Sequence, residues 1–178
     1  MNAVAQSFAC TLVGAMLLTA CGSPATTPSP PSAGRHPVTT PTPDLKQASR
    51  DLERIANEYV DGLQHRVSLF QTAYKAQDGT GVHGQALAIL QATTALDDGV
   101  AKLSLPAAAE SDRAALRSAD AALEAVMESL LEASSWDDVV SAYQQLPGKE
   151  TALQQALQKL ESNVGAAPLT VLPPIAGR

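Results

Sequence analysis

Aromatic residues are scarce in this chain. They make up 3% of its 178 residues, although hydrophobic residues as a whole reach 45%. Alanine and leucine supply most of that apolar content. Strands favour aromatic and β-branched residues, whereas alanine and leucine are strong helix formers, so the composition favours packed helices over sheets.

Cysteine is equally scarce, with Cys10 and Cys21 as the only two. Cys10 lies in an apolar segment that we expect to be removed on export, so the mature chain would hold one cysteine and no internal disulfide. Neither cysteine has a neighbouring histidine at the spacing of a zinc or haem attachment motif. The fold must therefore depend on its apolar core, and we expect no cofactor.

Basic residues are outnumbered. The chain carries 12 Lys and Arg against 18 Asp and Glu, a formal charge of −6, and all of the acidic residues lie within residues 44–164. Such a surface repels the phosphate backbone of DNA or RNA, and no basic stripe offsets the repulsion. We therefore expect that the protein does not bind nucleic acid.

No uncharged apolar run is long enough to cross a bilayer. The longest covers residues 8–18, which is shorter than the ~20 residues that a membrane-spanning helix needs and suits the core of a signal peptide. It ends in Leu18-Thr19-Ala20-Cys21. This motif resembles the lipobox of bacterial lipoproteins, although residues 1–7 lack the usual Lys or Arg.

The resemblance implies that residues 1–20 are a lipoprotein signal peptide. It implies transfer of diacylglycerol to the Cys21 sulfur, cleavage before Cys21 and acylation, such as palmitoylation, of the new amino terminus. Two or three acyl chains anchor a protein stably where one would not. The protein would then be membrane-anchored and extracytoplasmic: on the outer face of the cell membrane, or in the periplasm or outer membrane of a diderm.

Residues 21–43 form a separate zone after the proposed cleavage site. Residues 22–43 contain seven Pro, five Thr and three Ser, with no run of large apolar residues. Such a composition cannot bury enough apolar surface to offset the entropy of ordering. We therefore predict a disordered linker that holds the next domain away from the lipid surface.

Residues 44–165 show helical periodicity. The first helix is predicted to have Thr42 as its N-cap and to end at Asp78-Gly79-Thr80-Gly81. The apolar residues that recur at helical spacing within it are Leu45, Leu52, Ile55, Tyr59, Leu63, Val67, Phe70 and Tyr74. Similar patterns end at Leu105-Pro106 and Ser134-Ser135.

The last part of this region is predicted to be a broken helix. Ser135 and Asp138 form a capping arrangement, Pro147-Gly148 interrupts the pattern, and Gly165 ends it in a left-handed conformation. Short connections favour antiparallel neighbours. The prediction is an all-α, up-and-down four-helix bundle whose last helix is broken at Pro147. Residues 166–178 form an irregular tail that either docks on the bundle or binds another molecule.

Four carboxylates stand four residues apart on the third predicted helix: Asp120, Glu124, Glu128 and Glu132. This acidic stripe could bind a divalent cation or a basic partner, but it could equally be a solvated helix face. Like charges at this spacing repel by a few tenths of a kcal/mol. In an antiparallel bundle Arg66 or Lys75 could neutralise the stripe, and otherwise it is the best candidate contact surface.

No catalytic or metal-binding arrangement stands out. His36, His65 and His83 lie on different segments, without the Glu-x-x-His pattern of a di-iron bundle or the His-Glu-x-x-His pattern of a metalloprotease. No Gly-x-Ser-x-Gly elbow occurs, and no cysteine remains to act as a nucleophile. Trp136, the one tryptophan, is better explained as packing at the end of the bundle than as a ligand platform.

The outline of anchor, spacer and alanine-rich helical domain resembles the small lipoproteins of unknown function that are common in high-GC bacteria. The leading hypothesis is a non-enzymatic, lipid-anchored module that binds another envelope component, most simply a protein. The alternatives are an immunity or inhibitor lipoprotein for a basic effector, an enzyme acting on cell wall or lipid, and a carrier of apolar ligands. A buried polar cluster would favour the enzyme, an apolar cavity the carrier, and an exposed patch the binding module.

Overall fold

The computed structural model describes residues 44–177, and this part of the chain is helical, without a strand. Its elements are α1 (Leu45–Lys75), α2 (Gly79–Ala101), a short 3-10 turn (Ala107–Ala109), α3 (Glu110–Glu132), α4 (Trp136–Tyr143) and α5 (Leu146–Val164). None of these helices is both long and apolar enough to span a membrane. The predicted signal peptide, the proposed lipid attachment site Cys21 and the predicted linker lie outside the described residues.

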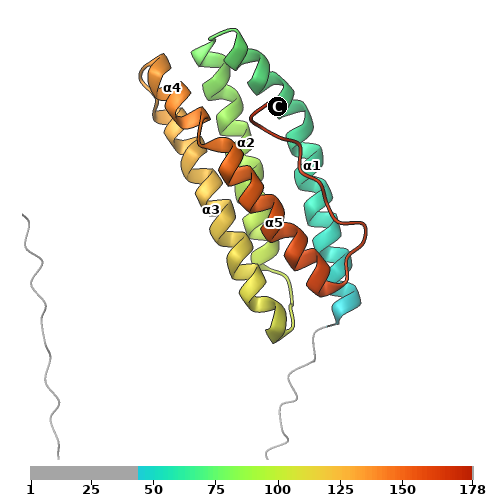
Figure 1. Cartoon of the computed structure of the whole chain (residues 1–178). Coiled ribbons are helices and arrows are strands. Elements are labelled where there is room, and N and C mark those ends of the chain that lie inside the picture. The colour runs from blue at the N-terminus through green and yellow to red at the C-terminus, as the bar shows by residue number, and fades with distance from the viewer. Residues whose placement is uncertain (1–43, 178) are drawn as a thin grey trace, which may run out of the picture. The chain divides into compact units, whose positions relative to one another are not determined.

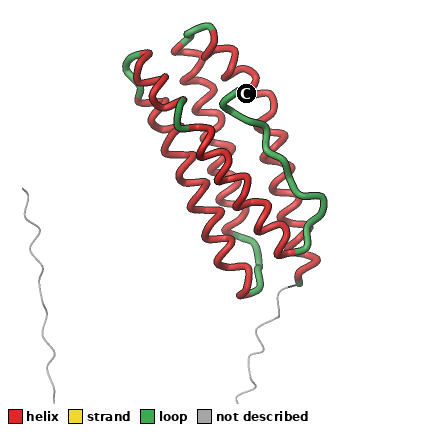
Figure 2. Tube along the Cα trace, in the orientation of Figure 1, coloured by secondary structure: helices red, strands yellow, loops and turns green. Residues whose placement is uncertain are grey.

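The long helices pack side by side around one core. α1 contacts α2 and α5, and α3 contacts the same two helices, so the four close on each other, while the short α4 packs against α3 (Figure 1). Each long helix in turn runs opposite to the one before it (Figure 2). The largest fully buried side chains are Phe70, Leu52, Leu63, Ile89, Leu96, Leu116, Leu123, Met127, Leu130, Leu146, Leu153 and Leu157. The predicted all-helical architecture is confirmed for this part of the chain.

The first two helices begin at aspartates. Asp44 is the N-cap of α1, because its side chain accepts hydrogen bonds from the backbone N–H groups of Lys46 and Gln47. A helix capped at the predicted Thr42 would have Asp44 in its first turn, but Asp44 is itself the cap, and Thr42 lies outside the described residues. Asp78 caps α2 in the same way. The segment predicted to end the first helix, residues 78–81, therefore starts the second.

The break in the last helix lies at residues 144–145, three residues before the predicted Pro147-Gly148. α4 ends at Tyr143 and α5 begins at Leu146, so Pro147 lies in the first turn of α5 instead of at the interruption. Proline is tolerated there because the first turn of a helix has no partner for its backbone N–H groups. The predicted cap is confirmed: Ser135 and Asp138 form a complete capping box at the start of α4.

The tail, residues 166–177, lies against the bundle. Gly165 ends α5 with a φ of 79°, in the predicted left-handed conformation. The chain then runs back along α1 and α5 toward the end of the bundle where α4 lies (Figure 1). Ile175 and Ala176 are buried, whereas Leu169 and Val171 remain exposed. Docking, one of the two roles considered for these residues, is thus what the structure shows.

Candidate binding groove between α1 and α5

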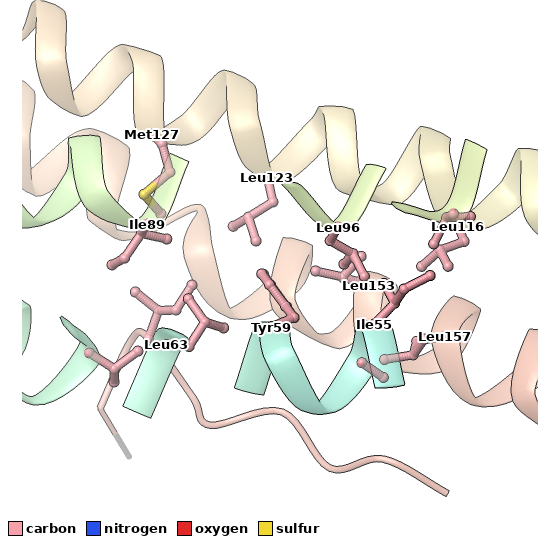
Figure 3. Close-up of a cluster of buried hydrophobic side chains, with 14 of the residues drawn as sticks. Ile55, Tyr59, Leu63, Ile89, Leu96, Leu116, Leu123, Met127, Leu153 and Leu157 are labelled. Atoms are coloured by element: carbon pink, nitrogen blue, oxygen red, sulfur yellow. The ribbon is translucent and has the colours of Figure 1, made fainter. Parts of the chain in front are cut away.

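The tail occupies a groove between α1 and α5, which we call the tail groove. A cavity of about 520 Å³ lies along it, lined by the tail, by α5 and by core residues of α1 and α3. Tyr59, Leu63, Leu123 and Leu153 form the apolar floor of this cavity. All four belong to the cluster of buried side chains in Figure 3. The groove therefore combines an apolar floor with a wall of polar side chains from α5.

Thr170 is the most heavily bonded residue of the tail. Its backbone N–H donates to Glu161 Oε2 at 2.9 Å, and its hydroxyl donates to the other oxygen of the same carboxylate. Its carbonyl oxygen accepts from Gln154 Nε2 at 2.6 Å and from Gln158 Nε2 at 3.1 Å. Three side chains of α5 thus hold the backbone and the hydroxyl of one tail residue.

The same kind of contact continues toward the end of the tail. The Leu172 N–H donates to Gln154 Oε1 at 2.6 Å, and the Ala176 N–H donates to Glu150 Oε1 at 2.7 Å. From α1, Gln71 Nε2 donates to the carbonyl oxygens of Pro174 at 2.9 Å and Ile175 at 3.2 Å.

Burial raises the pKa of Glu150, although the Ala176 N–H that its carboxylate accepts opposes the rise. Taken together, the hydrogen bonds of the groove join side chains of α1 and α5 mainly to main-chain atoms of the tail.

The backbone N–H groups that α5 binds belong to alternate residues of the tail. They are those of residues 170, 172 and 176, and the residue missing from this series is Pro174, which has no N–H. Successive residues of an extended chain face opposite ways, which accounts for the N–H groups of residues 170 and 172. The chain bends at residues 175 and 176, so the Ala176 N–H reaches Glu150 after a change of direction. The groove is therefore matched to a segment with proline where no N–H is bound.

A small polar cluster lies inside the bundle next to this groove. Tyr59, Thr93 and Asp120 come from α1, α2 and α3, and their exposed fractions are 4%, 0% and 1%. The Tyr59 hydroxyl and both carboxylate oxygens of Asp120 have no hydrogen-bond partner. Tyr59 also lines the tail groove, whereas Asp120 does not.

The environment of Asp120 disfavours its charged form. Burial raises the pKa of Asp120 to about 8, and the nearby carboxylates of Glu124 and Asp97 act in the same direction, against the opposing effect of Arg117. Burial likewise raises the pKa of Tyr59. The cluster thus combines one neutral carboxyl with a phenol and a hydroxyl, and the Thr93 hydroxyl donates to the Ile89 carbonyl oxygen at 2.8 Å.

The predicted acidic stripe does not form one surface. Asp120 points into the core and Glu124 is half-buried, accepting a hydrogen bond from Thr94 at 2.8 Å, whereas Glu128 and Glu132 are exposed. Residues four apart in an α-helix are rotated by about 40°, so a line of four turns from the core toward solvent. Asp120 is therefore not part of an exposed stripe, and a contact role for the exposed Glu128 and Glu132 stays a prediction.

Arg66 and Lys75 do not neutralise the acidic stripe, since neither forms an ion pair with it within the described residues. The cation beside Asp120 is instead Arg117, and it is held by Asp97 of α2 through two contacts of 2.7 and 2.9 Å. This pairing lowers the pKa of Asp97, chiefly through the hydrogen bonds to the guanidinium group. Asp97 therefore serves to join α2 to α3.

Histidines do not gather into a site. His65 is exposed on α1, and His83 is half-buried on α2 with an unpartnered Nε2. Within residues 44–177, no group of three or more His, Cys, Asp or Glu residues could hold a metal ion. Trp136 packs against Tyr74, with ring centroids 5.3 Å apart, at one end of the bundle.

Sequence reasoning missed two features that the pattern did contain. Asp120 follows Leu116 by four residues and precedes Leu123 by three, which is the spacing of a core position. The polar residues of α5 that bind the tail, Glu150, Gln154, Gln158 and Glu161, also recur at helical spacing. Their partner is a distant segment without regular structure, so no local pattern pointed to it.

Comparison with known proteins finds no matching protein-family model, no significantly similar curated protein and no significantly similar solved structure.

Proposed function

We propose that this protein is a lipid-anchored, non-enzymatic binding module of the bacterial envelope, and that the tail groove holds an extended segment of a partner protein. One observation carries the proposal: α5 presents side-chain amides and carboxylates to the main-chain atoms of the tail. Main-chain hydrogen bonds give affinity for any extended peptide, while pockets for its side chains give specificity. We expect such a peptide to follow the path of the tail.

The sequence supports the anchoring part of the proposal. Residues 18–21 resemble a lipobox, and the Pro- and Thr-rich residues 22–43 suit a spacer. A lipid anchor confines the domain near a surface where partners in the same envelope are concentrated. A groove of moderate affinity would then be enough to bind such a partner.

A carrier of apolar ligands is the second candidate. The cavity of about 520 Å³ beside the tail falls within the size range of small-molecule sites and has an apolar floor. In this alternative the tail would act as a strap over a lipid or another apolar molecule. The two candidates share the groove and differ in the chemistry of its occupant.

Site-specific photo-cross-linking in intact cells tests the proposal. A photoreactive residue replaces Gln158 in the groove, and a matched one replaces the exposed Ala121 on α3. We expect a protein adduct from position 158 that is absent from position 121. Mass spectrometry of that adduct should identify an extended peptide of the partner. A lipid adduct would support the carrier instead, and identical products at both positions would contradict a role for the groove.

A further inference from the structure

The segment that fills the tail groove has a near-copy in the linker. Residues 170–178 read Thr-Val-Leu-Pro-Pro-Ile-Ala-Gly-Arg, and residues 27–35 read Thr-Pro-Ser-Pro-Pro-Ser-Ala-Gly-Arg. Six of the nine positions are identical. The chain therefore carries the sequence that its own groove binds a second time, between the proposed lipid attachment site and α1.

The near-copy keeps every hydrogen-bonding group that the groove binds in the tail. Thr27 would supply the N–H, hydroxyl and carbonyl that Thr170 presents to Glu161, Gln154 and Gln158. Ser29 and Ala33 keep the N–H groups of Leu172 and Ala176, and Pro31 and Ser32 keep the carbonyls that Gln71 binds.

Two prolines occupy the same places in both segments, where the groove binds no N–H. A third proline, Pro28, replaces Val171, which is 74% exposed and whose N–H makes none of the groove's hydrogen bonds.

The differences lie in the apolar side chains. Leu172 and Ile175 of the tail are replaced by Ser29 and Ser32. Ile175 is 1% exposed and Leu172 packs against the core, so the tail gains burial that the near-copy lacks. We expect this loss to weaken binding on the order of 100-fold. The tail is therefore the stronger occupant, and the linker segment binds where the tail has left.

Residues 27–35 can reach the tail groove of a second molecule more easily than the tail groove of their own molecule. Gln71 lies 26 residues beyond Leu45, about 39 Å along α1 at 1.5 Å per residue. From Ala33, which would face Glu150 close to Gln71, the twelve steps to Leu45 span at most about 43 Å even when fully extended, which leaves almost no slack. The chain would also have to reverse direction, which shortens its reach further. A neighbouring molecule has no such limit.

From these observations we infer that the tail groove is the receptor for residues 27–35 of a second copy of this chain, and that residues 170–177 compete with them in cis. The inference rests on the proposed function, because it names a ligand for the same groove. Removal of the tail from the groove would let anchored copies associate. The affinity of the tail for the groove thus sets the surface density at which anchored copies associate.

Sedimentation velocity on residues 21–178 carrying Cys21→Ser tests this inference. Leu172→Ser and Ile175→Ser together give the tail the residues of the linker segment, so the two compete on more equal terms. We expect this variant to dimerise at a concentration at least 10-fold lower than the parent. Adding Ala33→Pro removes the N–H intended for Glu150 and should reverse the gain, whereas the matched Ala25→Pro, outside the segment, should not. A gain that survives Ala33→Pro, or the absence of a gain in a folded variant, would overturn the inference.

Peptide titration covers the case in which the serine variant does not fold. Peptides of residues 170–178 and 27–35 are added to the parent protein, and the side-chain amide NMR signals of Gln71, Gln154 and Gln158 are followed. We expect both peptides to shift the same signals, with the linker peptide weaker on the order of 100-fold. Binding of the tail peptide alone would refute this inference and leave the proposed function standing. Binding of neither would contradict the groove as a peptide site.

Discussion

Asp120 is the residue at which the bundle departs most from an apolar core. Its carboxyl is buried among three helices without a hydrogen-bond partner. Transferring a charged carboxylate into such a place costs far more than transferring the neutral acid, which is why burial raises the pKa of Asp120 to about 8. The neutral acid is therefore the form compatible with the folded bundle near neutral pH.

The raised pKa of Asp120 predicts a stability that falls with rising pH. The unfolded chain releases this proton near pH 4 and the folded chain near pH 8, so deprotonation favours unfolding between these values. Asp120→Asn removes the titration. From pH 5 to pH 9, we expect the unfolding free energy of the wild type to fall relative to that of the variant. Urea denaturation at each pH measures both values.

Other groups near Asp120 do not obscure this comparison. Glu124, Asp97 and Arg117 act on its carboxyl and are present in both proteins, as is Tyr59, whose own pKa responds to Asp120. The pKa of Tyr59 is raised and that of Asp97 is lowered, so neither group titrates between pH 5 and pH 9 in the folded protein. A difference that stays constant across this pH range would show that Asp120 does not titrate with a raised pKa in the folded chain.

α4 depends on its cap because it has only eight residues. The Ser135 hydroxyl accepts the Asp138 N–H at 3.2 Å, and the Asp138 carboxylate accepts the Ser135 N–H at 3.0 Å. Ser135→Ala should destabilise the protein by about 1 kcal/mol, the usual cost of losing an N-cap. Ser141→Ala, an exposed change in the same helix, is the matched control. Equal midpoints in thermal denaturation for the two variants would contradict a stabilising role for the cap.

The position of Pro147 leads to a second prediction, about the break between α4 and α5. Because this proline lies in the first turn of α5 and is exposed, its missing N–H costs no helical hydrogen bond. Pro147→Ala should therefore change the unfolding free energy by less than about 0.5 kcal/mol. The break between α4 and α5 should persist. Chemical-shift analysis that shows a continuous helix from residue 136 to residue 164 would refute this explanation.

Helix existence and most helix ends could be predicted because they depend on local chemistry. Apolar spacing marks each long helix, and the Ser135–Asp138 cap and the Gly165 stop act within a few residues. The break near Pro147 was misplaced because a proline suits the start of a helix as well as its end. Asp78 was read as the end of one helix for a similar reason: aspartate and glycine occur at both kinds of boundary.

The candidate site was less predictable, because it depends on long-range packing. The tail lacks regular periodicity, so its path along α1 and α5 follows from contacts such as that of Gln71 with Pro174, more than 100 residues apart. Asp120 had the spacing of a core residue, but its charge favoured a place on the surface. Cys21 and the linker remain predictions from the sequence alone.

The anchoring proposal concerns the whole molecule and predicts where it resides. With Cys21→Ser the sulfur that would accept the lipid is gone, so the protein should be left soluble or unprocessed in fractionated cells. Cys10→Ser, within the expected signal peptide, should leave localisation unchanged. If the Cys21 variant still sediments with membranes as a processed form, lipidation is not the anchor.

Most of the aromatic rings of the domain gather at one end of the bundle. Tyr74 stacks on Tyr143 with ring centroids 3.7 Å apart, Phe70 lies 6.1 Å from Tyr143, and Trp136 touches Tyr74. Because the sequence has a single tryptophan, its fluorescence emission observes only the junction of α1 and α4. Local fraying of α4 would change the indole spectrum before the rest of the bundle opens. Circular dichroism, which samples all helices, should then give a later transition than fluorescence.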